Sequence, residues 1–177
     1  MVPITYKISD QPKAGFAIQS VVLQTKEVTL YGPTDVVNKY EVYRGPDVTV
    51  ANLPLGKNII QLKIPLASGL YKTEPDQLQL EITIVKSEQK QFTNIPIKVN
   101  GLSKGFTAKV ISPGHSTLTL EGAPTNLNST QNDEIQAFVD LTNLPSGEHE
   151  VEIQYNVPLY TKVVSNKEKA KVQIIKE

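Results

Sequence analysis

Two histidines, His115 and His149, are the first residues whose side chains could do chemistry, because imidazole binds metals and transfers protons near neutral pH. His149 has Glu148 and Glu150 on either side and Glu152 close by, and these residue types can bind zinc. In a strand, however, His149 and Glu150 point to opposite faces, so the local sequence provides at best a partial ligand set. We therefore expect a solvated turn and strand here, and no metal site.

Serine chemistry would need a base held beside the hydroxyl group. Ser112 and Ser116 lie near His115 in the sequence, but they surround Pro113-Gly114. Proline and glycine side by side are typical of a turn. We interpret these serines as turn residues.

Paired carboxylates are the remaining catalytic candidates, because two carboxyl groups can divide acid and base roles. Asp35 with Glu41 and Asp133 with Glu134 form such pairs, which on polar segments are usually solvated charges. A glycosidase would also need a cleft rich in aromatic residues, and the chain has no tryptophan. A glycine-rich loop that could cradle phosphates is absent too. We predict that the chain is not an enzyme and has no catalytic residue, metal or cofactor.

Residues 40–46, "YEVYRGP", have the composition of a protein contact. Arg44 is the single arginine of the chain, and tyrosine and arginine are the side chains most enriched at binding hot spots. We therefore treat Tyr40, Tyr43 and Arg44 as candidate contact residues for a partner protein. The alternative is that Tyr40 covers the edge of the core, Tyr43 lies on the surface and Arg44 is a solvated charge.

The charge and cysteine counts exclude several classes of function. In a chain of 177 residues, 18 basic residues balance 18 acidic ones, so the positive surface that nucleic acids require is missing. The absence of cysteine excludes disulfides and thiolate metal sites. Apolar runs are a few residues long, far short of the roughly 20 that span a bilayer. We expect the chain as given to be soluble.

An internal repeat indicates how the chain is organised. The motif Asn-Leu-Pro-x-Gly occurs at residues 52–56 and again at residues 143–147, which is 91 positions later. Around it, matching residues follow at an offset of 90 that becomes 91 where Ala123 is inserted and returns to 90 after a later deletion. The matched sets are Gly15-Phe16 with Gly105-Phe106, residues 28–32 with 118–122, Pro33-Thr34 with Pro124-Thr125, Val48 and Val50 with Val139 and Leu141, Ile60, Leu62, Ile64 and Leu66 with Val151, Ile153, Tyr155 and Val157, and Leu80, Ile82 and Ile84 with Ala170, Val172 and Ile174. This pattern predicts two tandem domains, residues 1–87 and 91–177.

The spacing of two between matched apolar residues is the strand period, so we predict a mainly β fold with about five strands per repeat. One face of each strand should be buried, with Gln61, Lys63, Glu150, Glu152 and Gln154 facing water. The polar residues 86–90 contain no glycine or proline, which predicts a fairly stiff junction between the two domains.

Turn residues divide these strands. In Asn-Leu-Pro-x-Gly, proline sets φ for the first corner, glycine accepts a positive φ, and leucine can fill the core beneath the turn. The motif should lead into the longest strand of each domain. Gly32-Pro33 should end a strand, because glycine tolerates positive φ and proline cannot donate to a ladder. Residues 34–40 could then form one or two helical turns, whereas we expect their counterpart, residues 125–134, to be a surface loop.

Together, these elements resemble the YbbR-like domain. The second repeat carries the resemblance best, because residues 137–158 contain a Val-Asp-Leu strand with Asp140, the Leu-Pro-x-Gly turn and a long alternating strand. The first repeat departs from this pattern, with Thr49 at the aspartate position. The residues that we assign to the motif are Gly32, Pro33, Asn52, Leu53, Pro54, Gly56, Gly122, Pro124, Asp140, Asn143, Leu144, Pro145 and Gly147.

The resemblance implies a function that the residues alone do not. YbbR-like domains occur in tandem, commonly behind one membrane-spanning helix on the outer face of Gram-positive bacteria. CdaR-like members regulate the membrane diadenylate cyclase CdaA, which makes cyclic di-AMP. The resemblance therefore implies extracytoplasmic, non-catalytic domains of a protein anchored by an N-terminal transmembrane helix, with a CdaA-like cyclase as partner. The alternatives are a module that binds a cell-wall or carbohydrate ligand, and a hydrolase with its site between the domains.

Overall fold

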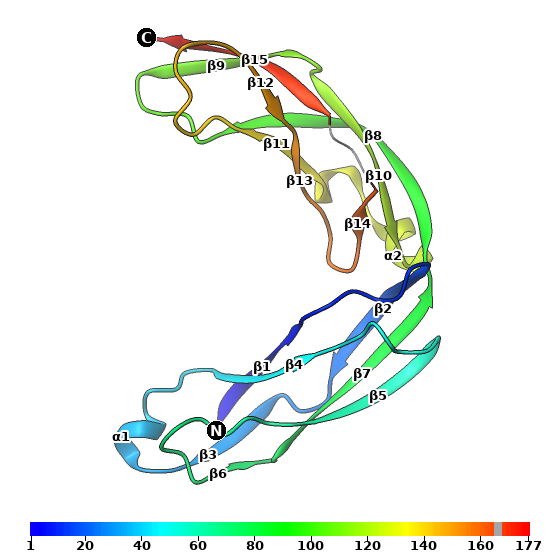
Figure 1. Cartoon of the computed structure of the whole chain (residues 1–177), viewed down its shortest axis with the longest axis vertical. Helices are drawn as coiled ribbons and strands as arrows, with labels where there is room; N and C mark the ends of the chain where they lie inside the picture. Colours follow the sequence, from blue (N-terminus) through cyan, green and yellow to red (C-terminus); the bar gives the residue numbers. More distant parts are fainter. Residues whose placement is uncertain (165–167) are drawn as a thin grey trace. The chain divides into compact units, whose positions relative to one another are not determined.

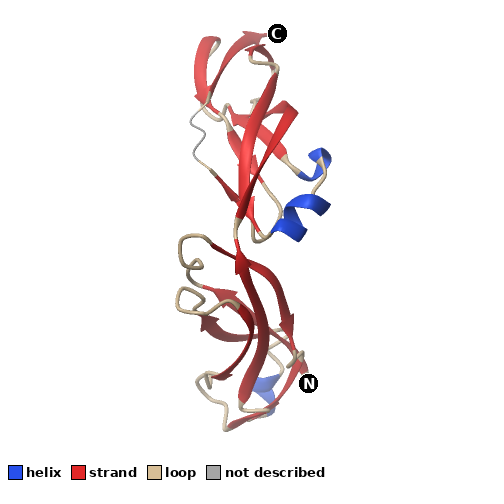
Figure 2. Cartoon of the chain, turned by 90° about the vertical axis from the view of Figure 1, so that its right-hand side faces the viewer, coloured by secondary structure: helices blue, strands red, loops and turns tan. Residues whose placement is uncertain are grey.

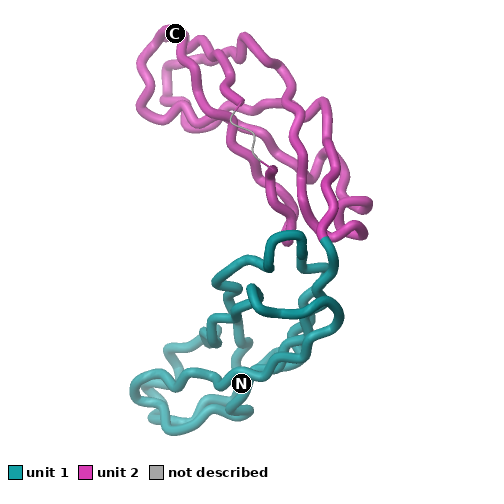
Figure 3. Tube along the Cα trace, turned by 45° about the vertical axis from the view of Figure 1, so that its right-hand side comes forward, with its two compact units in different colours: residues 1–86 teal, residues 87–177 magenta. Residues whose placement is uncertain are grey.

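The computed structural model describes residues 1–164 and 168–177 of the chain. Contacts divide these residues into two compact units, Met1–Lys86 and Ser87–Glu177, which Figure 3 shows in separate colours. Strands make up most of both units, and the helices are short, as Figure 2 shows. The structure confirms the predicted mainly β fold in two tandem domains.

The first unit contains seven strands and one short helix, labelled in Figure 1. They are β1 (Val2–Ile8), β2 (Phe16–Leu23), β3 (Glu27–Tyr31), α1 (Thr34–Val37), β4 (Tyr43–Val48), β5 (Gly56–Lys63), β6 (Lys72–Glu74) and β7 (Gln77–Lys86). The strands form a four-stranded sheet in the order β4-β1-β3-β6 and a three-stranded sheet in the order β2-β7-β5.

The second unit repeats this plan with one additional strand at one edge of its larger sheet. Its elements are β8 (Glu88–Asn100), β9 (Phe106–Ser112), β10 (His115–Gly122), α2 (Pro124–Ser129), the 3-10 helix η1 (Asn132–Glu134), β11 (Gln136–Asp140), β12 (Gly147–Glu152), β13 (Gln154–Asn156), β14 (Lys162–Val163) and β15 (Lys169–Lys176). The sheets have the orders β13-β11-β8-β10-β14 and β12-β15-β9.

Alternation along the strands produces the core of each unit. Leu80, Ile82 and Ile84 of β7 are at most 1% exposed. Their counterparts Ala170, Val172 and Ile174 of β15 are also buried, in one cluster with residues of the five-stranded sheet. The interleaved side chains expected to face water, Gln61, Lys63, Glu150, Glu152 and Gln154, are all exposed. The predicted assignment of strand faces is therefore confirmed.

Strand number and strand length differ from the prediction. The described residues form seven strands in one unit and eight in the other, and three of these strands, β6, β13 and β14, have only two or three residues. The strands that follow Asn-Leu-Pro-x-Gly, β5 and β12, are shorter than β7 and β8, which have 10 and 13 residues. The expectation that the motif leads into the longest strand was therefore wrong.

The segment after Gly-Pro is helical in both units. Helix α1 begins at Thr34, as predicted, and none of its residues is buried. The predicted surface loop at residues 125–134 was wrong, because α2 and η1 occupy it. Leu127 explains the difference, since its side chain is 2% exposed within the core, and Gln131 and Glu134 form a capping box that starts η1.

The helices of the described residues are also too short and too polar to cross a membrane.

Candidate protein-contact surface

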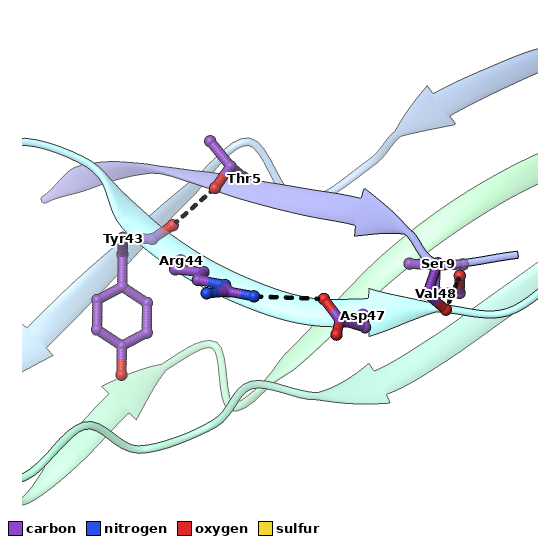
Figure 4. Close-up of polar contacts among 6 residues, drawn as sticks. All are labelled: Thr5, Ser9, Tyr43, Arg44, Asp47 and Val48. Carbon is purple, nitrogen blue, oxygen red and sulfur yellow. Dashed lines mark hydrogen bonds and ion pairs between the residues drawn. The ribbon is translucent and has the colours of Figure 1, made fainter.

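The candidate contact residues lie on and just before β4, which is an edge strand of the four-stranded sheet. β4 runs parallel to β1, with Ile4 beside Tyr43 and Thr5 beside Arg44. The Thr5 hydroxyl donates to the Tyr43 carbonyl over 3.4 Å, and the Ser9 hydroxyl donates to the Val48 carbonyl over 3.3 Å (Figure 4). Two hydroxyl groups therefore tie β1 to both ends of β4.

Tyr43 is not available to a partner. Its side chain is 2% exposed, and its hydroxyl donates to the Pro65 carbonyl over 2.6 Å while accepting from the Ala67 amide over 2.9 Å. This corrects the expectation that Tyr43 is a contact residue, and also the alternative that it lies on the surface. The ring points into the unit because alternation along β4 places Tyr43 on the core face.

Arg44 and Tyr40 remain as candidates for contact. The Arg44 side chain is 80% exposed, and its guanidinium lies along the strand, 3.8 Å from the Asp47 carboxylate (Figure 4). Such an exposed ion pair holds the side chain weakly. Tyr40 is half-buried, and its ring meets the Tyr43 ring edge-on at 5.4 Å. The surface that can contact a partner therefore consists of Arg44 with the outer part of Tyr40.

Proline residues limit the pairing of a further strand with the free edge of β4. In the second unit the matching strand, β11, pairs with β13, and Ala137 lies opposite Tyr155. In the first unit Pro46 stands at the position of Ala137, and Pro65 at the position of Asn156. Proline has no amide hydrogen for a ladder, so the tyrosine hydroxyl holds residues 65–67 instead. The surface at β4 is therefore suited to side-chain contacts more than to strand addition.

The two copies of Asn-Leu-Pro-x-Gly form turns, as predicted. Gly56 and Gly147 have φ angles of 105° and 125°, which favour glycine. The amides of Leu53 and Leu144 donate to the carbonyls of residues 50 and 141, and Leu144 packs against the core. Asn143 itself has a positive φ of 62°, which asparagine tolerates well.

The His149 side chain closes its turn through a hydrogen bond to the backbone. Its Nε2 lies 2.7 Å from the Pro145 carbonyl oxygen and must carry the proton to donate there. At the matching position, Asn58 donates to the Pro54 carbonyl over 3.0 Å. Among the described residues no group of His, Asp and Glu side chains is placed to hold a metal ion. The equivalence with Asn58 gives His149 a structural role.

A carboxylate caps the backbone beside each turn, but it comes from a different strand in each unit. Asp10, which follows β1, accepts from the Val50 amide over 2.6 Å and from the Ala51 amide over 3.3 Å. In the second unit Asp140, at the end of β11, accepts from the amide and hydroxyl of Thr142. These two bonds lower the pKa of Asp140. The motif aspartate therefore has a capping role.

Asp10 was missed by sequence reasoning, because the offset of 90 found before Ala123 matches it with Asn100. The structure pairs Ile8 with Val48 and Val99 with Val139, so β1 and β8 correspond at an offset of 91 and Asp10 matches Gly101. Thr49 matches Asp140. A carboxylate is therefore lost at one position and gained at the other, and strand pairing reveals the exchange.

Gly32 and Gly122 are required for a reason other than the predicted one. Neither has a positive φ. A Cβ on Gly32 would lie 3.1 Å from the Gly69 carbonyl oxygen, and one on Gly122 would lie 3.3 Å from the Tyr160 carbonyl oxygen. Close approach of another segment therefore selects glycine. The prolines that follow begin the helices, with Pro33 as the N-cap of α1 and Pro124 in the first turn of α2.

The serines do not form a catalytic site. Ser116 is 1% exposed, and its hydroxyl lies 2.6 Å from the Tyr155 hydroxyl and 3.1 Å from the Glu168 carboxylate. Burial raises the pKa of Tyr155, as does the charge of Glu168, while the Ser116 bond lowers it. This network joins β10, β13 and the start of β15, and its serine hydroxyl has no imidazole partner among these contacts.

Residues 101–105 also read Gly-Leu-Ser-Lys-Gly, which is a Gly-x-Ser-x-Gly pattern. In hydrolases, this pattern presents a serine on a sharp turn between a strand and a helix. Here it joins two strands, β8 and β9, and Ser103 is exposed. Gly101 gives room to the Asp140 cap, because a Cβ there would lie 2.5 Å from the carboxylate oxygen. The pattern is therefore a loop of the fold.

A hollow of about 660 Å³ lies beside β6 in the first unit. The residues that line it are Lys63, Ile64, Leu66, Lys72, Thr73, Glu74, Pro75 and Asp76. None of them is aromatic, and they include two lysines and two carboxylates. The lining does not favour a sugar, which usually stacks on aromatic rings.

Comparison with known proteins gives one family over both units. The family model described as YbbR-like protein matches residues 2–84 and 95–174. The chain is also 27% identical over 175 residues to the CdaA regulatory protein CdaR of Bacillus subtilis (strain 168). The match covers 98% of this chain and 36% of that relative, so the chain spans little more than a third of its length.

Solved structures of similar proteins carry the same description. A YbbR-like domain from Listeria monocytogenes is 25% identical, with a TM-score of 0.45, and the match covers 51% of this chain and 95% of that domain. A YbbR-like protein from Streptococcus pneumoniae TIGR4 is 15% identical, with a TM-score of 0.43, and the match covers 99% of this chain and 92% of that one.

Proposed function

Because the chain belongs to the YbbR-like protein family, we propose that it is a non-catalytic, extracytoplasmic part of a membrane-anchored regulator of a membrane diadenylate cyclase. The observation that carries the proposal is the similarity along nearly the whole chain to the CdaA regulatory protein. Regulation would act on the synthesis of cyclic di-AMP and would need contact between proteins. A membrane-spanning segment outside the given sequence would connect the chain with the cyclase.

Arg44 and the outer part of Tyr40 are the residues that we assign to a protein contact. An exposed guanidinium beside an aromatic ring offers charge and apolar area together, which is the composition of many hot spots. The matching segment of the second unit has Asp133 and Glu134 and no aromatic residue, so the fold itself does not require this pair. A partner that presents a carboxylate to Arg44 would displace the weak Asp47 contact.

Co-expression with the cyclase tests the function. The full-length protein that contains this chain is expressed together with a CdaA-like cyclase. The cyclic di-AMP level in these cells is then compared with the level in cells that express the cyclase alone. We expect the level to change, and pull-down to recover the cyclase. An unchanged level together with no recovery would contradict the proposal.

A charge reversal tests the contact separately. We expect Arg44→Glu to move the cyclic di-AMP level toward that of the cyclase alone, without lowering the melting temperature. Tyr43→Phe is the matched control, because it removes two buried hydrogen bonds and costs about 1–3 kcal/mol of stability but leaves the outer surface unchanged. If regulation survives Arg44→Glu, the contact lies elsewhere on the protein.

A further inference from the structure

The strands β5 and β12 occupy matching places in the two units. Each is the last strand of its three-stranded sheet, beside β7 in the first unit and beside β15 in the second. Within the described residues, neither strand pairs with another strand along its outer side. Each unit therefore presents a free edge at the same place in the fold.

The side chains at these two edges carry opposite charge. On β5 the outward row contains Lys57, Ile59, Gln61 and Lys63, all exposed. At an offset of 91, the outward row of β12 contains Glu148, Glu150 and Glu152, also exposed. A basic edge in one unit thus corresponds to an acidic edge in the other.

Ion pairs within each sheet neutralise only part of the charge of these two rows. Lys57 lies 3.1 Å from Glu81 of β7, and Lys171 of β15 lies 3.1 Å from Glu148. Lys63, Glu150 and Glu152 form no ion pair among the residues that the structure describes. Beside them, Ile59 is 63% exposed, an apolar side chain that a neighbouring strand would cover.

Charge at a sheet edge decides which strand can approach it. Like charges directly opposite one another destabilise a strand pair, so β5 repels a second β5 and β12 repels a second β12. Opposite charges stabilise such a pair and steer its encounter. Because both complementary edges belong to one sequence, a second copy of the chain is the partner that both edges fit.

We propose that copies of this chain associate through β5 of one copy and β12 of the other. The interaction extends a three-stranded sheet across the copies, and each copy offers one edge of each sign. It uses neither Arg44 nor Tyr40, and it does not depend on the proposed link with the cyclase. Because the charges are exposed, salt should weaken the association.

Charge exchange between the two edges tests the proposal on the 177-residue chain. One variant carries Lys57→Glu and Lys63→Glu, and a second carries Glu148→Lys, Glu150→Lys and Glu152→Lys. Sedimentation velocity at low and high salt measures association of each variant and of their equimolar mixture. We expect the unchanged chain to associate at low salt, each variant alone to associate about tenfold or more weakly, and the mixture to regain association.

A matched control reverses two exposed lysines away from these edges, Lys13→Glu and Lys26→Glu, and should leave association unchanged. Circular dichroism checks that each variant keeps its β structure. The proposal is overturned if the unchanged chain stays monomeric at low salt up to about millimolar concentration. It is equally overturned if the mixture of the two variants fails to associate, or if each variant alone associates as well as the unchanged chain.

Discussion

The two units cap the same backbone amide with carboxylates from different strands. In the first unit the Ala51 amide donates to Asp10, which follows β1. In the second unit the matching Thr142 amide donates to Asp140, which lies at the end of β11. The units therefore preserve an interaction although neither residue position is preserved. Residue-by-residue comparison would report a lost motif in the first unit, whereas the structure retains the contact.

A second difference concerns the strand that follows β5 or β12. In the second unit, β13 continues the sheet beside β11, with Ala137 paired to Tyr155. In the first unit, Pro46 and Pro65 stand at the positions of Ala137 and Asn156 and offer no amide hydrogen for this pairing, and the Tyr43 hydroxyl bridges residues 65 and 67. One buried side chain there replaces several backbone bonds, which makes the first unit more dependent on a single residue.

The largest difference in stability between matching mutations of the two units should arise in the helices α1 and α2. Leu127→Ala in α2 removes a side chain that is 2% exposed, and should cost the second unit about 2–5 kcal/mol because a cavity remains. The matching Val36→Ala in α1 removes a half-buried side chain and should cost the first unit about 1 kcal/mol. Urea unfolding with hydrogen exchange read separately in β7 and β15 measures both costs. Equal costs would show that both helices anchor their units alike.

Moving the capping carboxylate from one position to the other should have an intermediate effect on the free energy of unfolding. Asp10→Gly leaves the Val50 and Ala51 amides without their acceptor and should cost about 2 kcal/mol. Adding Thr49→Asp, which copies the second unit, should recover about 1 kcal/mol of that loss. Thr49→Asp alone is the control and should also lower stability, because a second carboxylate would crowd Asp10 at the same amides. If the double variant is no more stable than Asp10→Gly, the two arrangements are not equivalent.

The smallest expected effect is a dependence of the stability of the second unit on pH. Hydrogen bonds from Thr142 lower the pKa of Asp140 below its ordinary value of 3.8. The unfolded state therefore takes up a proton first as the pH falls, so the contribution of Asp140 is complete above about pH 4 and is lost below it. Melting temperatures between about pH 2 and pH 5 should fall more steeply for the natural chain than for Asp140→Asn. Parallel curves would contradict this assignment.

The repeat and the strand faces could be predicted because alternation reports burial directly. Leu80, Ile82 and Ile84 recur as Ala170, Val172 and Ile174, and all six are buried. The resemblance to YbbR-like domains, based on the turn motif and Asp140, is confirmed by the family match over both units. These features depend on local sequence, where period and turn chemistry suffice.

The remaining features depend on contacts between distant segments. Tyr43 was treated as a contact residue because tyrosine and arginine are enriched at hot spots, whereas its hydroxyl has partners 22 and 24 residues away in the core. Leu127 lies in a polar stretch and is buried only because the core of the second unit receives it. The close approach that selects Gly32 comes from Gly69, which no local pattern indicates. Long-range packing therefore determined what the sequence pattern missed.

The exchanged carboxylate also links two of the substitutions that distinguish the two units. A Cβ on Gly101 would lie 2.5 Å from the Asp140 carboxylate, so a chain with both aspartates would be crowded at this place. A chain with neither aspartate would leave the amide uncapped. Each single substitution between the two arrangements should therefore lower the stability of its unit. The two substitutions are expected to be coupled, so the effect of one depends on the other.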